Sequence, residues 1–453
     1  MKTGKNTSPA PASADTPEAV DLLIHARWII PVEPAGITLE NHSLAVHDGR
    51  IAGLLPRADA ERRFAPSEVV ELGEHVLLPG FVNLHTHAAM TLMRGLADDL
   101  PLEKWLGERI WPAESRHVSA EFVHDGTLLA AAEMLRGGIT CCNDMYFFPD
   151  AAARAFTAAG MRAMLGITVL EFPTPYASDA DDYIAKGLAV RDAWRTHPLI
   201  SFSLAPHAPY TVSDRTFERI ATLSAQLDLP VHVHVHEAAS EIENSLKQYG
   251  MRPLTRLHQL GLVNPSLIAV HAVHLDVTDI GLLAMEGASV AHNPTSNMKL
   301  ASGASPVVGL ARQGINIGLG TDGAASNNRL DMFQEMRHAA LLGKLTAHDA
   351  AALNAHTVLH MATLGGARAM GLADSIGSLE IGKFADMCAI RLDDWLLQPC
   401  FAPASHLIYV AGREQVSHVW VAGQCRVNAH TLVDFDLPAL LAVINLWQNK
   451  LQV

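Results

Sequence analysis

The sequence predicts an α/β protein in which a (β/α)8 TIM barrel carries a small β-sandwich domain formed from both termini. Three observations predict this fold. Short apolar strands alternate with helix-like stretches through the middle of the chain, short strands bounded by turns fill both ends, and reactive polar side chains follow the central strands. Alternating strands and helices form right-handed βαβ units around a parallel sheet.

The barrel is assigned to residues 78–377, where eight apolar strand candidates recur. In chain order they are LPGFVNLHTH, GITCCNDMYF, MRAMLGITVLE, LISFSLAPHAP, LPVHVHVHE, SLIAVHAVHL, ASVAHNP and INIGLGTDG. Eight strands are the number that closes a (β/α)8 barrel.

The two ends of the chain share one sequence pattern, in which short apolar strands are separated by turns that contain Gly, Asp and Pro. His-Asp-Gly at 47–49 and Val-Ala-Gly at 421–423 are hairpin-turn sequences. We therefore assign the β-sandwich to residues 20–77 together with 378–430, and a C-terminal helix to 431–453. Residues 1–19 are rich in Pro, Ala, Ser and Thr without hydrophobic periodicity and are predicted to be a disordered tail.

Composition favours a small-molecule enzyme. The net charge of −14 argues against nucleic acid and anionic membranes as partners. No stretch of about 18 apolar residues predicts a membrane helix, and the first residues lack the apolar core of a secretory signal. Five cysteines without a CxxC spacing predict reduced thiols and a cytoplasmic location.

Polar side chains occur at the C-terminal ends of seven of the eight predicted strands. Barrel enzymes take their catalytic residues from this end. These residues are His85 and His87, Asn143 and Asp144, His207, His234, His271, His292, and Asp322.

A metal site is predicted from strands one, five and eight. His85 and His87 are two residues apart, so their side chains point the same way from a strand. A histidine of strand five and Asp322 would complete a three-nitrogen, one-oxygen set suited to Zn2+, with Fe2+ as the alternative. In VHVHVHE, period two places His232, His234 and His236 on one face, and spacing does not choose between His234 and His236 as the ligand.

The chain resembles the amidohydrolase superfamily and, within its chlorohydrolase-like branch, the 5-methylthioadenosine/S-adenosylhomocysteine deaminases. The motifs that carry the resemblance are LPGFVNLHTHAAMTLMRGLADDLPLEKWL, GITCCNDMYF, APHAPYT, HVHEAASE, VHAVHL, AHNPTSNMKLASG and LGTDGAASNNRLDMFQEMR. The resemblance implies one divalent metal per subunit, because strand four (ISFSLAPH) has no lysine to bridge two ions. It also implies a homo-oligomer, either a dimer or a tetramer.

The family's H-x-x-E motif selects His234 as a ligand beside His85, His87 and Asp322, and makes Glu237 the proton shuttle. His271 resembles the group that polarises the attacking water, and Asp322 would also accept the proton of that water. His236 is then expected to pack or to lie at the rim, and His232 to lie deep in the barrel.

The resemblance also implies the contacts of an adenosine-type nucleoside. Glu114 corresponds to the carboxylate that holds the ribose hydroxyls, and His207 to the ligand of a purine ring nitrogen. Trp105 is expected to close the pocket, while Ser326 and His292 are expected near its rim.

One departure bears on the substrate. Family members that accept S-adenosylhomocysteine carry an Arg near the end of strand three, where this chain has Ile167, and Arg162 matches a different, structural position. Because an apolar side chain cannot pair with a carboxylate, we expect Ile167 to line a slot for a methylthio group. The expected reaction converts 5′-methylthioadenosine to 5′-methylthioinosine and ammonia, with S-adenosylhomocysteine or adenosine as secondary substrates.

Other readings are a deaminase of guanine, 8-oxopurines or cytosine, a triazine chlorohydrolase-like enzyme, and a non-catalytic metal-binding scaffold. A free base has no ribose for Glu114 to hold, and a scaffold does not need the proton shuttle Glu237.

Overall fold

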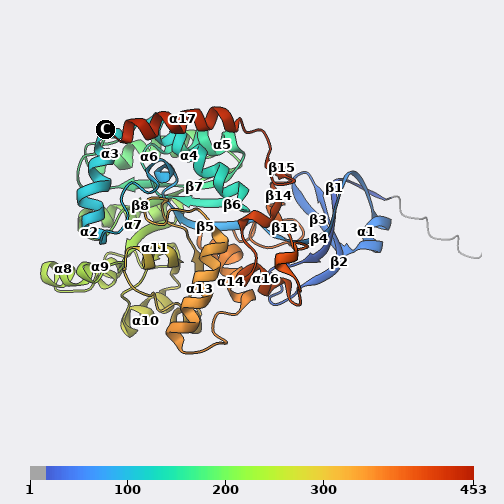
Figure 1. Cartoon of the computed structure of the whole chain (residues 1–453). Coiled ribbons are helices and arrows are strands. Elements are labelled where there is room, and N and C mark those ends of the chain that lie inside the picture. The colour runs from blue at the N-terminus through green and yellow to red at the C-terminus, as the bar shows by residue number, and fades with distance from the viewer. Residues whose placement is uncertain (1–16, 453) are drawn as a thin grey trace, which may run out of the picture.

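The computed structural model describes residues 17–452, which form two sheets of eight strands each (Figure 1). Neighbouring strands of the barrel sheet follow one another in the chain and run parallel. They are β5 (Phe81–Thr86), β6 (Ile139–Asp144), β7 (Arg162–Val169), β8 (Ile200–Pro206), β9 (Val231–Val235), β10 (Leu267–His271), β11 (Ser289–His292) and β12 (Ile317–Leu319). The predicted (β/α)8 barrel is confirmed, and each predicted strand candidate contains one of these strands.

The barrel closes where the residues after β12 meet β5. The Asp322 N–H donates to the His85 carbonyl oxygen over 3.0 Å. The Thr321 N–H donates to Asn83 Oδ1 over 2.9 Å. This seam places the end of strand eight beside the end of strand one, as a metal site shared between them requires.

Helices surround the barrel strands, and several begin at a Ser, Asp or Asn whose side chain accepts a backbone N–H, as Ser119, Asp179 and Asp331 do. The helices between the strands are α4 (Ala120–Arg136), α5 (Pro149–Ala159), α6 (Ala180–Trp194), α7 (Asp214–Leu227), α8 (Ala239–Tyr249), α9 (Pro253–Gln259), α10 (Val277–Glu286), α11 (Pro294–Lys299) and α12 (Val307–Arg312). After β12 follow α13 (Met332–Ala347), α14 (Ala355–His360), the π-helix η3 (Met361–Gly365) and α15 (Gly366–Ala369).

The connection after β5 is built of short helical pieces. They are the 3-10 helix η1 (Ala88–Met93), α2 (Leu102–Lys104), the π-helix η2 (Trp105–Ile110) and α3 (Trp111–His117). Because this segment leaves the C-terminal end of β5, it lies at the end of the barrel where catalytic residues are expected.

The second sheet joins both ends of the chain in the order β16-β15-β14-β13-β4-β1-β2-β3. Its N-terminal elements are β1 (Glu18–Ile29), β2 (Leu39–His47), β3 (Arg50–Pro56), α1 (Arg57–Arg63) and β4 (Phe64–Pro79). Its C-terminal part contains β13 (Met387–Arg391), η4 (Trp395–Leu397), α16 (Pro403–Tyr409), η5 (Arg413–Gln415), β14 (Val416–Val421), β15 (Gln424–Asn428) and β16 (Thr431–Leu432).

All eight strands of this second domain belong to one continuous sheet, which curls over its own core. The Ile51 N–H donates to the Lys383 carbonyl oxygen and the Ala385 N–H donates to that of Gly49, each over 2.9 Å. These bonds bring the β2–β3 hairpin, at one edge of the sheet, onto the chain that leads into β13. Ile24, from the N-terminal half, and Trp420, from the C-terminal half, consequently share one buried cluster.

The sequence-based boundaries shift at both ends. Strand β1 begins at Glu18, which pairs with Phe64 of β4, so residues 18 and 19 belong to the sheet and not to the predicted tail. Residues 1–16 lie outside the described part of the chain. Thr431 and Leu432 pair with β15, and the predicted C-terminal helix is α17 (Leu437–Leu451).

Helix α17, red in Figure 1, lies across the barrel helices beside α4. The Trp447 indole N–H donates to Asp125 Oδ2 over 2.8 Å, and its ring contacts Phe122 with 5.2 Å between centroids. Among the described residues, no helix has the length and apolar character needed to cross a membrane.

Candidate active site

Four candidate metal ligands meet at the C-terminal end of the barrel strands. His85 Nε2 lies 3.2 Å and His87 Nε2 lies 3.3 Å from Asp322 Oδ1. One nitrogen from each of His85, His87 and His234 lies within 4.8 Å of the others. The side chains predicted from strands one, five and eight are therefore brought together.

The second ring nitrogen of each histidine is engaged elsewhere. His87 Nδ1 donates to the Met145 carbonyl oxygen over 2.6 Å and His234 Nδ1 to that of His207 over 2.7 Å. His85 Nδ1 lies 2.9 Å from Nε2 of His232, the histidine expected deep in the barrel. With each Nδ1 engaged in this way, Nε2 is the nitrogen that remains to bind an ion, which is the arrangement that metal-binding histidines adopt. The donor set of three imidazoles and one carboxylate fits a divalent metal ion.

Besides the two histidines of strand one, three donors hold Asp322 in place. Its Oδ2 accepts from Ser296 Oγ over 2.6 Å and from Ser326 Oγ over 2.7 Å, and its Oδ1 accepts from the Gly323 N–H over 2.8 Å. Burial opposes its charge, but the hydrogen bonds from His85 and His87 hold the pKa of Asp322 well below its usual range. The carboxylate is thus ionised and fixed in orientation.

Ser326 and His292 do not occupy the places expected of them. Ser326 is absent from the residues that line the pocket, and its hydroxyl donates to Asp322, so the pocket lining gives no support to its predicted substrate contact, which stays a prediction. His292 is fully buried and also does not line the pocket. His292 is the last residue of β11 and Ser326 lies in the loop after β12, yet both side chains point into the packed protein rather than toward the opening.

The structure resolves the choice within VHVHVHE by ending β9 at Val235. His236 adopts a φ of 57°, which breaks the strand period. Its Nε2 accepts the Leu254 N–H over 3.0 Å and its Nδ1 lies 3.2 Å from the His274 carbonyl oxygen. His236 is therefore a packing residue, and His234 remains as the ligand candidate of strand five.

Glu237 and His271 face each other beside the ligand cluster. His271 Nε2 lies 3.7 Å from Glu237 Oε2, while His271 Nδ1 lies 2.8 Å from Asn297 Oδ1. Burial raises the pKa of Glu237, against the opposing effect of His271. A carboxyl group whose pKa is raised in this way is suited to carrying a proton during a reaction.

Glu241, on the first turn of α8, fixes the backbone at Glu237. Its Oε2 accepts the Glu237 N–H over 2.9 Å, and among the described residues its Oε1 has no hydrogen-bond partner. Burial raises the pKa of Glu241 to about 8. The sequence showed this residue only as part of the charged stretch EAASEIE, without a role.

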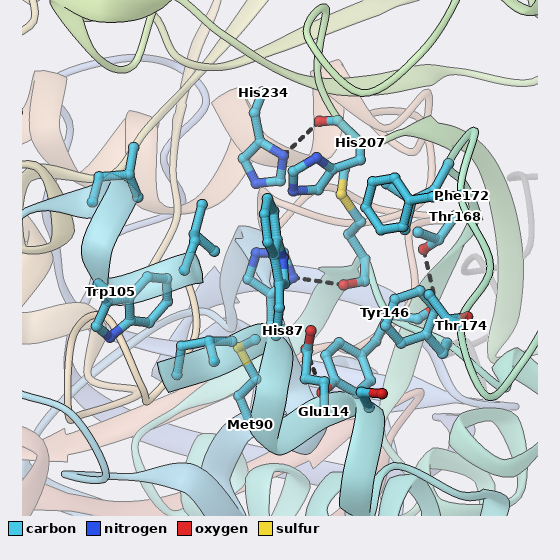
Figure 2. A pocket seen from close by; sticks show the side chains of 18 of the residues that line it. His87, Met90, Trp105, Glu114, Tyr146, Thr168, Phe172, Thr174, His207 and His234 are labelled. Atoms are coloured by element: carbon cyan, nitrogen blue, oxygen red, sulfur yellow. Dashed lines mark hydrogen bonds between the residues drawn. The ribbon is translucent and has the colours of Figure 1, made fainter. Parts of the chain in front are cut away.

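The pocket over the cluster is bounded by Glu114 on one side (Figure 2). Glu114 is 8 % exposed and its Oε1 accepts the Tyr146 O–H over 2.8 Å. Burial raises the pKa of Glu114 to about 7, although the Tyr146 hydrogen bond lowers it. Glu114 therefore presents a carboxyl group to the pocket from α3.

His207 and Trp105 also line this pocket. His207 Nδ1 lies 3.0 Å from Thr211 Oγ1. Burial, followed by the charges of His87 and His85, lowers the pKa of His207 to about 3, so the imidazole is neutral. Trp105 is 5 % exposed, and its indole N–H has no partner among the described residues.

Ile167 does not line the pocket, which corrects the prediction made for it. It points outward from β7 toward α6, where a Cβ added to Gly187 would lie 2.2 Å from Ile167 Cγ2. Its neighbour Thr168 faces the pocket instead, because successive side chains of a strand alternate. Arg162 has the structural position expected of it and pairs with Asp386.

The lining of the pocket contains no Lys or Arg among the described residues. Its polar members are a few histidines, carboxyls and hydroxyls, and the others are mainly apolar or aromatic side chains, among them Trp111 and Phe172.

The sequence analysis missed several residues of the site. They are Tyr146, Thr168, Phe172, Tyr210, Ser296 and Asn297. Tyr146, Ser296 and Asn297 stand within the motifs quoted above, but only tertiary contacts reveal their partners.

Comparison with known proteins matches residues 76–426 to the Amidohydrolase family. A 5-methylthioadenosine/S-adenosylhomocysteine deaminase from Teredinibacter turnerae is 48 % identical over 95 % of this chain and 98 % of its own length. A protein of the same name from Saccharophagus degradans is 47 % identical over 95 % and 97 %, respectively.

Solved structures agree with these relatives. The crystal structure of an adenosine deaminase from Xanthomonas campestris with bound zinc superposes with a TM-score of 0.95 at 51 % identity, covering 96 % of this chain and all of that chain. An atrazine chlorohydrolase from Arthrobacter aurescens complexed with zinc superposes with a TM-score of 0.87 at 24 % identity, over 94 % of this chain and 100 % of that one. The latter likeness supports the fold alone.

Proposed function

The chain belongs to the amidohydrolase family and, within it, to the 5-methylthioadenosine/S-adenosylhomocysteine deaminases, and from this premise we propose that it hydrolytically deaminates an adenosine-type nucleoside. It is thus a hydrolase acting on C–N bonds. The observation that carries the proposal is one pocket in which Glu114 faces the same space as His234, Glu237 and Asp322. A carboxylate suits the vicinal hydroxyls of a ribose, and the cluster suits attack on the purine ring.

His85, His87, His234 and Asp322 would hold the metal. When bound, a divalent ion lowers the pKa of its water from about 15.7 toward about 7 and so supplies hydroxide at neutral pH. We propose Zn2+, with Fe2+ as the alternative, because a structure that is 51 % identical to this chain contains zinc. Metal analysis of the purified protein and reconstitution of the apoprotein with each ion separate the two.

The chain's own residues move the protons. Asp322, held ionised by its hydrogen bonds, accepts a proton from the attacking water. His271 Nε2 orients the water and stabilises the oxygen charge that develops at C6. Glu237 donates a proton to ring nitrogen N1, takes up the proton of the new C6 hydroxyl as the carbonyl forms, and passes it to the departing amino group, which leaves as ammonia. The proton that Asp322 accepted from the water then restores Glu237 to its starting state. Neutral His207 faces the purine edge and can hydrogen-bond a ring nitrogen.

We propose 5′-methylthioadenosine as the preferred substrate and 5′-methylthioinosine as the product. Ile167 does not contribute to this preference, because its side chain faces α6. The support for the preference is the pocket lining, in which the described residues include no cation to pair with the amino-acid carboxylate of S-adenosylhomocysteine.

The test is ammonia release with parallel ultraviolet spectra on 5′-methylthioadenosine, S-adenosylhomocysteine, adenosine and guanine. The proposal expects kcat/KM to be highest for 5′-methylthioadenosine. Equal turnover of S-adenosylhomocysteine contradicts the preference, and turnover of guanine alone contradicts the nucleoside assignment. In that last case Glu114→Ala would leave KM unchanged. The homo-oligomeric state and the cytoplasmic location remain predictions.

A further inference from the structure

We propose that Trp111 and Phe172 form the subsite for an uncharged, apolar 5′ substituent and thereby set the preference for 5′-alkylthio nucleosides; this inference rests on the proposed function. Both aromatic rings line the pocket, and both are more than one-third exposed, at 37 % and 38 %. Their ring centroids lie 5.9 Å apart at an interplanar angle of 63°. They come from different segments, α3 and the loop after β7.

The place of Trp111 relative to Glu114 points to the 5′ end of the nucleoside. Trp111, Glu114 and Ser115 occupy positions i, i+3 and i+4 of α3, so they share one face of the helix, and all three line the pocket. If Glu114 accepts the ribose hydroxyls, Trp111 lies one helical turn away along the same wall. The part of a nucleoside that extends from the ribose, away from the base, is its 5′ substituent.

Phe172 is held in position by its loop. The Tyr183 hydroxyl lies 3.3 Å from the Phe172 carbonyl oxygen and 2.6 Å from Thr174 Oγ1. The preceding residue is fixed as well, since Glu171 Oε1 accepts the Ser213 N–H over 2.9 Å. Phe172 projects from this loop into the pocket (Figure 2). The subsite is consequently preformed on the Phe172 side, which reduces the cost of ordering it on binding.

The chemistry of the pair suits a thioether. Aromatic rings make favourable contacts with sulfur, and two partly exposed rings gain by burying a methyl group against them. The described residues that line the pocket include no Lys or Arg, so a charged amino-acid tail finds no ion-pair partner there. A hydroxyl at C5′, as in adenosine, gains little from either ring.

The experiment compares three substrates that differ only at C5′: 5′-methylthioadenosine, adenosine and 5′-deoxyadenosine. Trp111→Ala and Phe172→Ala are each expected to lower kcat/KM for 5′-methylthioadenosine about tenfold, mainly through KM, which is the range for losing contact with one small apolar group. For 5′-deoxyadenosine we expect little change. Phe172→Leu, which keeps an apolar side chain, should retain part of the preference.

Trp395→Ala and Phe401→Ala serve as matched controls, because these aromatic residues are 79 % and 90 % exposed and do not line this pocket. They should leave all three substrates unaffected. An equal loss for all three substrates in both pocket variants, or an unchanged preference in both, overturns the subsite. If an alanine variant fails to fold, Phe172→Leu and Trp111→Phe give the same comparison. A wild-type protein that deaminates adenosine without preferring 5′-methylthioadenosine overturns the subsite alone, whereas one that deaminates no nucleoside overturns the proposed function as well.

Discussion

At the scale of single residues, the chemistry of the pocket depends on carboxyl groups whose surroundings differ. Asp322 is surrounded by donors and stays ionised, whereas Glu114, Glu237 and Glu241 are buried with fewer donors and have raised pKa values. Carboxyl groups whose pKa values differ in this way can take different roles in one pocket: one accepts a proton, another carries a proton to the substrate, and another positions its neighbour.

Glu114 predicts a pH dependence of substrate capture. Its pKa is raised to about 7, and the ionised form is the better acceptor for ribose hydroxyls, so kcat/KM for the nucleoside should rise with pH through about 7. Tyr146→Phe removes the O–H that lowers this pKa, so the rise should move to higher pH. Profiles of kcat/KM between about pH 5 and about pH 9, the range in which histidines and buried carboxyl groups titrate, measure this shift. The metal content of each variant is the control. Glu114→Gln should remove the Glu114 contribution, and an unmoved rise in Tyr146→Phe would contradict the assignment.

Glu241 predicts a separation between binding and turnover. Because it fixes the Glu237 N–H, Glu241→Ala should lower kcat by about a hundredfold, the effect of displacing a catalytic group by roughly 1 Å, with little change in KM. Glu241→Gln keeps a carbonyl acceptor and should largely restore kcat. Glu243→Ala, an exposed carboxylate on the same helix, is the matched control. Equal losses in the alanine and glutamine variants would show that Glu241 does not act through this bond.

At the scale of elements, the strand pattern predicted which face carried the histidines but not where each strand ended. In VHVHVHE the alternation of Val and His indicated an inward histidine face, and His232 and His234 follow it. His236 departs because the chain turns after Val235. Ile167 was expected at the pocket because it stands where the family carries an Arg, but the alternation of side chains along β7 turns it toward α6 and turns Thr168 toward the pocket.

The seam between β12 and β5 permits one prediction at this scale. A Cβ added to Gly320 would lie 2.3 Å from Asn293 Oδ1 and 2.9 Å from the His85 backbone nitrogen. Gly320→Ala should therefore destabilise the protein by about 1–3 kcal/mol or more and weaken metal retention, because His85 must shift. Urea unfolding and metal analysis measure both effects.

Gly281→Ala is the control for this change. Gly281 lies in α10, and a Cβ there meets no atom within 4 Å. Alanine should instead stabilise the protein by about 1 kcal/mol, since glycine weakens a helix. A Gly320→Ala variant as stable as the wild type would contradict the close approach at the seam.

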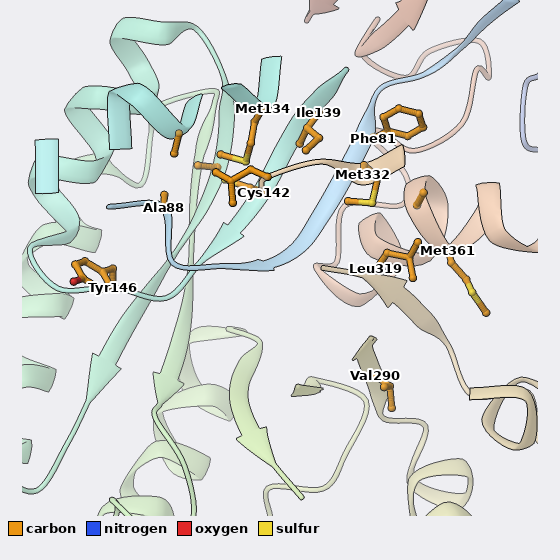
Figure 3. Close-up of a cluster of buried hydrophobic side chains, with 14 of the residues drawn as sticks. Phe81, Ala88, Met134, Ile139, Cys142, Tyr146, Val290, Leu319, Met332 and Met361 are labelled. Atoms are coloured by element: carbon orange, nitrogen blue, oxygen red, sulfur yellow. The ribbon is translucent and has the colours of Figure 1, made fainter. Parts of the chain in front are cut away.

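At the scale of the whole molecule, side chains from distant parts of the chain build the layers that support the site. Phe81 of β5, Met134 of α4, and Ile139 and Cys142 of β6 lie in one buried cluster (Figure 3). The two domains are joined by a buried ion pair. Arg162 Nε, at the start of β7, donates to Asp386 Oδ2 over 2.9 Å, and Arg162 Nη2 donates to Oδ1 over 3.1 Å.

Removing one partner of this pair should be costly. Arg162→Ala leaves a buried carboxylate without its cation, and we expect the free energy of unfolding to fall by about 3–5 kcal/mol. Arg57→Ala is the matched control, because the Arg57–Glu71 pair is 46 % and 57 % exposed and should contribute at most about 1 kcal/mol. Chemical denaturation measures the free energy of unfolding of both variants. Similar small losses would show that the interdomain ion pair stabilises the protein no more than an exposed pair does.

The sequence by itself determined the barrel, the assembly of a second domain from both termini, and three of the candidate metal ligands, His85, His87 and Asp322, while spacing left the ligand of strand five open between two histidines. Strand periodicity and the position of polar residues after apolar strands are local properties, and the barrel rule converts them into a common location. Only the tertiary structure decided that Ser326 supports Asp322, that Ile167 faces outward, and that Glu241, Tyr146, Trp111 and Phe172 bear on the pocket. Their partners lie on other segments or depend on where a strand ends, and such contacts are set by packing of the whole chain rather than by the order of nearby residues.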